Sequence, residues 1–348
     1  MTQATVPDAL VGAVEAAARA LGSAVASVGQ ARGNPVGAPG VARRVARVAL
    51  ADGRVVAVKV SARDAPAARE AATLRFLHDR GASVAQPLAW GDDGDGWLAT
   101  VWAGDVTLDA ALAGASDAPV EALGLGLVEA LATVEAAFAP LTAVGTPPGA
   151  VATARELIAP WVEAAPPALE WLGVEARWAS VAYVAASGEA AIASPLTVGP
   201  LDYHAGNVVT GASTTIVDLA AVGWDWPARR VAQYTFATGA SPGGTFRSAL
   251  ARPVVEAAAS MLALVHGGSK ARWSEAIAAH ALVLVATAAW HLRGVATGRA
   301  DPERMASWGD VDRRRASLKA VAESLAPLRP HRYLRQALAL PSATPNHR

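Results

Sequence analysis

The residues with the clearest chemical pattern lie between positions 202 and 218. Asp202, Asn207 and Asp218 follow one another at intervals of five and eleven residues, with short apolar runs between the last two. Carboxylate and amide oxygens are ligands that a hard cation such as Mg²⁺ prefers. In phosphoryl transfer a first carboxylate accepts the proton of the attacking hydroxyl, while an amide oxygen and a second carboxylate hold the metal. The order of these residues therefore indicates Asp202 as a catalytic base and Asn207 and Asp218 as Mg²⁺ ligands.

A lysine and a glutamate form the second part of this pattern. Lys59 lies within the apolar run Val55–Val60 of a chain that has three lysines against 27 arginines. A charge in such surroundings needs a partner, and Glu70 follows eleven residues later. A strand lysine held by a helix glutamate can bind the phosphates of a nucleotide. Taken alone, a lysine at a strand edge and a solvated glutamate are the simpler explanation; together with the pattern at 202–218, a nucleotide site is favoured.

Hydrophobic periodicity predicts two lobes that would position these residues. The first hundred residues have the pattern of a small β lobe: a helix over 7–21, strands over 41–50, 55–60, 84–90 and 97–102, and a helix over 65–80. Later segments are mostly helical: 108–112, 120–138, 153–164, 178–186 and 231–325, with short β-like runs at 208–209 and 214–217. We therefore expect an α+β fold with a five-stranded antiparallel lobe and one key helix over 1–103. A larger helical lobe over 104–335 and a disordered tail over 336–348 would follow.

The motifs resemble those of the aminoglycoside phosphotransferase family. That family typically shows His-Gly-Asp-Leu-His-Pro-Gly-Asn, and residues 200–207 read Pro-Leu-Asp-Tyr-His-Ala-Gly-Asn. The Asp218 segment, Ile-Val-Asp-Leu, is similar to its second metal-binding motif, and Lys59 and Glu70 to its ion pair. Over about residues 24–240 the resemblance implies a protein-kinase-like bilobal fold, with Mg²⁺ as cofactor and ATP or GTP as phosphate donor.

The resemblance also implies where the nucleotide would bind. The hinge would be residues 98–104, where the backbone at Thr100 and Trp102 would contact the purine, so side chains do not choose between ATP and GTP. Gly37, in the glycine-rich stretch 33–40, would cover the phosphates, unless this stretch is a plain β-turn. Two positions depart from the family: Pro200 replaces the first motif histidine, and Arg230 lies where relatives carry a supporting aspartate.

Four residues are candidates for contact with the acceptor. Trp224, Asp225 and Trp226 follow Asp218 closely. The indoles would stack on a substrate ring or, as an equally weighted alternative, pack in the core. His204 is expected to order the catalytic loop and to lie near the acceptor.

Charge is unevenly distributed along a chain whose 30 basic and 30 acidic residues cancel. Residues 105–227 carry a net charge of −12 and residues 228–348 a net charge of +10. Packing of these two segments against each other is the favoured explanation, and a cleft with one acidic and one basic wall is the alternative. Because the expected acceptor helices are basic, the acceptor is expected not to be a strongly polycationic aminoglycoside.

Composition excludes several other classes of protein. The chain has no cysteine, which excludes disulfides, thiol catalysis and cysteine-ligated metals, and the zero net charge argues against polybasic nucleic-acid binding. The apolar stretch 276–292 is expected to be a buried helix, and residues 1–7 show no secretory signal. We expect a cytoplasmic monomer or homodimer that binds a nucleotide and a small-molecule hydroxyl acceptor, but neither nucleic acid nor membranes.

The expected activity is transfer of a nucleotide γ-phosphate to a hydroxyl of a small molecule, and an antibiotic is the favoured acceptor. A metabolic sugar or choline-type kinase would use the same chemistry on another acceptor. A non-catalytic nucleotide-binding pseudokinase is the alternative from a different class, favoured slightly by the departures at Pro200 and Arg230.

Overall fold

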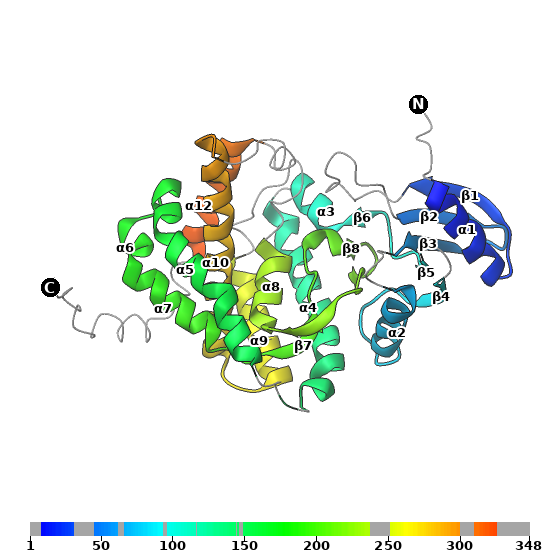
Figure 1. Cartoon of the computed structure of the whole chain (residues 1–348), viewed down its shortest axis with the longest axis horizontal. Helices are drawn as coiled ribbons and strands as arrows, with labels where there is room; N and C mark the ends of the chain where they lie inside the picture. The colour runs from blue at the N-terminus through cyan, green and yellow to red at the C-terminus, as the bar shows by residue number, and fades with distance from the viewer. Residues whose placement is uncertain are drawn as a thin grey trace.

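The structure is a computed structural model that describes residues 8–30, 45–61, 66–92, 96–115, 117–143, 145, 149–236, 251–299 and 310–325. Within these residues a small sheet-containing part and a larger helical part lie next to each other (Figure 1). This is the expected bilobal α+β fold. The predicted tail over 336–348 lies outside the described residues.

The small part is built on a five-stranded antiparallel sheet, as predicted. Its strand order is β1-β2-β3-β5-β4. The strands are β1 (Val25–Gln30), β2 (Val45–Leu50), β3 (Val55–Val60), β4 (Pro87–Gly91) and β5 (Trp97–Val101). Strand β1 lacks a regular alternation of apolar and polar residues, which explains why periodicity alone did not place it.

Alternation in β2 and β3 gives the sheet two different faces. One residue in two is buried along both strands, because successive side chains of a strand point to opposite faces. Val48, Val58 and their neighbours on one face pack against helix α1 (Asp8–Ala20), which covers the sheet from outside. Lys59 lies on the opposite face, which is turned toward the helical part.

Helix α2 (Ala67–His78) packs on the same face as Lys59. Its buried residues, among them Glu70 and Leu74, face β4, β5 and the core shared with the helical part. The segment after α2 joins this core directly, since Ile216 donates a backbone hydrogen bond to Ser83 at 2.8 Å. The Asp218 region is therefore connected to the small part through the segment that follows α2.

The helical part contains the remaining described helices. They are α3 (Leu108–Gly114), α4 (Asp117–Thr142), α5 (Ala150–Leu172), α6 (Ala176–Ala179), α7 (Val181–Ile192), α8 (Pro227–Phe236), α9 (Ala251–His266), α10 (Lys270–Ala296) and α12 (Val311–Leu325). The predicted boundary between residues 103 and 104 falls in the segment between β5 and β6 (Val106–Thr107), where Gly104 has a φ of 141°. A side chain there would meet Val209 at 3.0 Å, so this connection requires glycine.

Two short sheets in the helical part carry the candidate site. One pairs β6 with β8 (Val208–Thr210) and β9 (Thr215–Ile216), and the other pairs β7 (Thr197–Pro200) with β10 (Val222–Asp225). The β-like runs near 208 and 215 were predicted, whereas β6, β7 and β10 were not. The loop from β7 to β8 contains Asp202 and Asn207, and the loop from β9 to β10 contains Asp218.

Two of the described helices have the length and hydropathy of a membrane span. They cover Pro119–Thr142 and Lys270–Ala296, and 50% and 67% of their most apolar windows are buried inside the protein. Helix α10 packs on α5, α7, α8, α9 and α12. The stretch 276–292 is thus part of a buried helix, as the sequence predicted.

Candidate active site

Lys59 brings together residues from both parts of the chain. Its Nζ lies 2.9 and 3.1 Å from the two carboxylate oxygens of Glu70 and 2.5 Å from Oδ1 of Asp218. Lys59 and Asp218 are 159 positions apart in the sequence. The lysine side chain is 18% exposed and that of Glu70 is 3% exposed, so the ammonium group is largely withdrawn from water and partnered as its surroundings require.

The charges around Lys59 keep it protonated. Burial alone would lower the pKa of Lys59, but the carboxylates of Glu70 and Asp218 outweigh this and raise it. Burial raises the pKa of Glu70, against the opposing charge of Lys59. The result is a fixed positive charge between two acidic side chains at the junction of the two lobes.

Asp218 has an unusual backbone conformation. Its φ is +61°, the single positive value at a non-glycine residue within the described residues, and such a conformation costs about 1–3 kcal/mol. Its neighbours are held in place: Val217 donates a backbone hydrogen bond to Asn207 at 2.8 Å, and Leu219 is fully buried in the core. The segment is thereby fixed between the loop that contains Asn207 and the buried core.

Asn207 is buried, with 7% of its surface exposed, at the end of the short 3₁₀-helix η1 (Ala205–Asn207). Its Nδ2 donates to the backbone carbonyl of Asp202 at 3.1 Å. This bond uses the side-chain amide nitrogen of Asn207. The amide oxygen, which is the atom that would bind a cation, takes no part in it. Asp202 itself is exposed, as a base that must reach a substrate hydroxyl needs to be.

His204 lies in the loop between Asp202 and Asn207 and hydrogen-bonds within it. Its Nδ1 accepts the backbone N–H of Gly206 at 3.1 Å and caps η1. A β-carbon on residue 206 would lie 2.8 Å from the imidazole ring. Glycine is required here because the histidine ring lies against it, not because of a positive φ.

The hinge residues lie on and after β5. Thr100 pairs with Ala57 and Pro87 in the sheet, and Trp102 donates its backbone N–H to Val55 at 3.2 Å. The indole Nε1 of Trp102 is buried without a hydrogen-bond partner among the residues described, and the Arg47 guanidinium lies 5.9 Å from its ring. Gly37 lies outside the described residues.

Comparison with known proteins supports this arrangement at the level of the fold. No model of a protein family matches the sequence, and a search of curated proteins finds no match. Among solved structures, an aminoglycoside phosphotransferase from Alicyclobacillus acidocaldarius superposes with a TM-score of 0.54 over 98% of both chains, at 15% identity. The chain has the kinase-like fold of an aminoglycoside phosphotransferase.

Two further structures were found to be similar to this chain. A type VIII aminoglycoside-3'-phosphotransferase matches with a TM-score of 0.40 at 17% identity over 92% of this chain and all of that one. A macrolide 2'-phosphotransferase from Brachybacterium faecium matches with a TM-score of 0.45 at 17% identity, over 85% of this chain and 96% of that one. Identities this low leave the activity of the chain to the residues of its own site.

The candidate acceptor residues fall into two groups by burial. Trp226 is 1% exposed and packs 5.1 Å from the His280 ring in a core cluster, which favours the packing alternative for this indole. Asp225 is also buried and accepts the hydroxyl of Tyr203 and the backbone N–H of Trp226. Trp224, on β10, is only partly buried. The stacking alternative therefore stays open for this indole.

Arg230, which departs from the family pattern, forms a buried ion pair that the sequence did not indicate. Arg230 is fully buried and pairs with Glu135 of α4, at 2.6 Å from Nε to Oε1. An acidic residue of the middle segment thus neutralises a basic residue of the last one. This pair favours the explanation that the two oppositely charged segments pack against each other.

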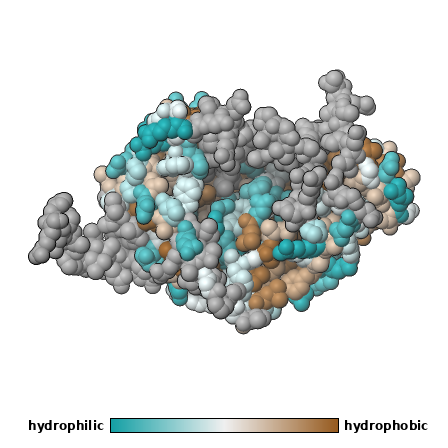
Figure 2. Space-filling view, viewed as in Figure 1, coloured by the Kyte–Doolittle hydropathy of each residue, from teal (hydrophilic) through white to brown (hydrophobic). Residues whose placement is uncertain are grey.

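The donor set fits Mg²⁺ better than a transition metal. The described residues contain no group of three or more His, Asp or Glu side chains that would enclose a metal ion. One amide oxygen and one carboxylate, from Asn207 and Asp218, are typical of Mg²⁺, which keeps water and phosphate oxygens as its other ligands. Figure 2 shows hydrophilic residues at the centre of the molecule, where the sheet-containing and helical parts meet.

Proposed function

We propose that the protein is a small-molecule phosphotransferase that moves the γ-phosphate of ATP or GTP to a hydroxyl group. The observation that carries the proposal is the ion-pair cluster of Lys59 with Glu70 and Asp218, which joins the two lobes. Lys59 would bind nucleotide phosphates, and Glu70 would hold its ammonium group in place. A bound Mg²⁺, held by Asn207 and Asp218, would neutralise charge on the phosphates.

Asp202 is the proposed base. Its exposed carboxylate would accept the proton of the acceptor hydroxyl as the oxygen attacks phosphorus. The hydrogen bond from Asn207 to the Asp202 backbone carbonyl supports this role, because it fixes the base relative to the proposed metal ligand. The hinge backbone at Thr100 and Trp102 would hold the purine.

An antibiotic is the proposed acceptor, with the result that phosphorylation would inactivate it. The net charge of +10 over residues 228–348 favours a neutral or anionic acceptor over a strongly polycationic one. Stacking of Trp224 on a ring of the acceptor would add affinity.

The test is an acceptor screen with purified protein, Mg²⁺ and either ATP or GTP, in which ³¹P spectra identify products. Aminoglycoside, macrolide, nucleoside-type and peptide antibiotics are compared with sugars and choline. A phosphorylated antibiotic supports the proposal, whereas a product from a sugar or choline alone favours a metabolic kinase. Nucleotide binding without any product would favour the pseudokinase alternative.

Two variants connect the product to the proposed residues. Asp202→Asn should abolish turnover while nucleotide binding persists, because the base is lost and the phosphate-binding residues remain. Asp312→Asn, a matched change at an exposed position on α12, should leave turnover unchanged. Equal activity of the Asp202 variant and the parent would contradict the assignment of the base.

A further inference from the structure

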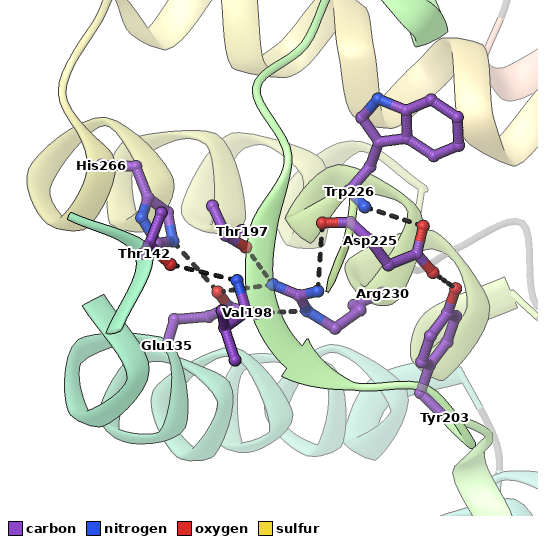
Figure 3. A network of polar contacts seen from close by, with 9 residues as sticks. All are labelled: Glu135, Thr142, Thr197, Val198, Tyr203, Asp225, Trp226, Arg230 and His266. Atoms are coloured by element: carbon purple, nitrogen blue, oxygen red, sulfur yellow. Dashed lines mark hydrogen bonds and ion pairs between the residues drawn. The ribbon is translucent and has the colours of Figure 1, made fainter. Parts of the chain in front are cut away.

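Arg230 on α8 is the most extensively bonded buried cation in the described part of the chain. Its side chain is 0% exposed, and its Nε and Nη2 donate to the two oxygens of Glu135 at 2.6 and 2.9 Å. Nη2 also donates to the hydroxyl of Thr197, and Nη1 to the backbone carbonyl of Asp225 at 3.3 Å. One planar guanidinium thus connects α4 with both β7 and β10 (Figure 3).

Glu135, the acidic partner of Arg230, is itself held by helix α9. Oε2 of Glu135 lies 3.0 Å from Nε2 of His266 at the end of α9. About two turns further along α4, the Thr142 hydroxyl accepts the backbone N–H of Val198 at 3.0 Å. Strand β7 is therefore attached to α4 at two points, through Arg230 and through Thr142.

These attachments lie immediately before the catalytic loop. Strand β7 ends at Pro200, two residues before Asp202. A β-carbon on Gly199 would lie 2.6 Å from Cζ of Arg230, so the strand passes directly against the guanidinium. Any displacement of Arg230 would be transmitted to the strand that leads into the proposed base.

The residue that follows Asp202 is held by the same network. The Tyr203 hydroxyl donates to Asp225, and burial together with the Asp225 charge raises the pKa of Tyr203, so that the hydroxyl keeps its proton. Asp225 is the residue whose carbonyl accepts from Arg230. Asp202 therefore lies between two points, Gly199 and Tyr203, that both depend on this network.

We propose that Arg230 and Glu135 are positioning residues that set the place of Asp202, which rests on the proposed function of that residue. A buried ion pair contributes little net stability compared with well-packed apolar side chains. Its role here is therefore to hold β7 and β10 in a fixed position. Arginine is required because its planar fork bonds in several fixed directions at once, whereas a lysine provides a single point of charge.

The central variant is Arg230→Lys, which keeps the charge and removes the fork. Arg252→Lys is its matched control, because Arg252 forms an exposed ion pair with Glu256 on α9. The double variant Glu135→Leu/Arg230→Met removes both buried charges and is expected to fold with nearly unchanged thermal stability. It keeps the proposal testable even where Arg230→Lys alone does not fold.

Two measurements distinguish positioning from a purely structural role. In steady-state kinetics, Arg230→Lys and the double variant should lower kcat about 100-fold and leave the KM for the nucleotide within twofold. In hydrogen–deuterium exchange, peptides covering 199–207 should exchange faster, while peptides of β3 and α2 remain as in the parent. Wild-type kcat and wild-type exchange in the double variant would overturn the proposal.

The two readouts also separate this inference from the function on which it rests. If the parent protein phosphorylates no acceptor, the proposed function fails, and exchange over 199–207 alone decides the positioning role. If the parent is active and Arg230→Lys exchanges and turns over as the parent does, the positioning role fails and the proposed function stands.

Discussion

The imidazole of His204 lies directly over Gly206, at 2.8 Å from the position that a β-carbon on residue 206 would take. The ring accepts the Gly206 N–H, so the close approach and the hydrogen bond belong to one turn. This turn separates the proposed base, Asp202, from the proposed metal ligand, Asn207, and its shape therefore sets their relative positions.

The first prediction concerns this contact. Gly206→Ala should lower turnover roughly 10- to 100-fold, because the new methyl group displaces His204 and shifts the loop. The double variant His204→Ala/Gly206→Ala should lose less than the sum of the two single losses, since the clash is removed. Gly211→Ala, in open space, is the control; strictly additive losses would contradict the contact.

The second prediction concerns the cluster that joins the lobes. Lys59→Met should lower turnover by roughly 100-fold or more, because a fixed charge aimed at the phosphates is lost. Lys319→Met is the matched control, since Lys319 forms an exposed pair with Glu323. Measured kcat/KM values for the nucleotide decide the matter, and similar values for both variants would argue against a phosphate-binding role for Lys59.

The third prediction uses the positive φ of Asp218. Asp218→Gly and Asp218→Ala both lack the carboxylate and should both lose Mg²⁺-dependent nucleotide binding. Glycine adopts the left-handed conformation without strain, so Asp218→Gly should be more stable than Asp218→Ala by about 1 kcal/mol. Urea denaturation measures the difference, and equal free energies of unfolding would mean that residue 218 is not strained.

The fourth prediction concerns the pH dependence of stability. Burial alone would raise the pKa of Glu135, but the Arg230 charge and the hydrogen bonds from His266 and Arg230 lower it to about 2. The ionised group therefore stabilises the fold above pH 4.5, its ordinary pKa, and this contribution is lost as the pH falls from 4.5 through about 2.

Glu135→Gln should consequently destabilise the protein most at neutral pH, by about 3–5 kcal/mol, because Arg230 is left buried without a countercharge. The difference in Tm between the parent and this variant should shrink between pH 4.5 and 2. Glu323→Gln, at an exposed ion pair, should show little difference at any pH. A constant gap over the acid range for Glu135→Gln would contradict the lowered pKa.

Local sequence was sufficient for the first level of organisation. The apolar run Val55–Val60 after a turn identified β3, and helical periodicity identified α2 with Glu70, whereas the face on which Lys59 lies came from the burial pattern of the folded strand. Residue chemistry then proposed Asp202, Asn207 and Asp218 as site residues, because their order and spacing are those of a phosphoryl-transfer site, and their roles stay predictions. These inferences depend only on neighbouring residues, and the periods of strands and helices encode them directly.

Long-range pairing could not be obtained in this way. The contact of Arg230 with Glu135 joins residues 95 positions apart, and the short strands β7 and β10 exist because they pair with each other. Sequence alone left the roles of Trp224 and Trp226 open, and only burial in the folded chain separated them.

The amino-acid sequence by itself thus determined which side chains are candidates for phosphoryl chemistry and which elements carry most of them. The tertiary structure decided how Lys59 meets Asp218, why residue 206 is glycine, and which buried charges hold the catalytic loop. The physical reason is that side-chain type and periodicity are local properties, whereas burial and the pairing of distant charges arise only when the whole chain packs.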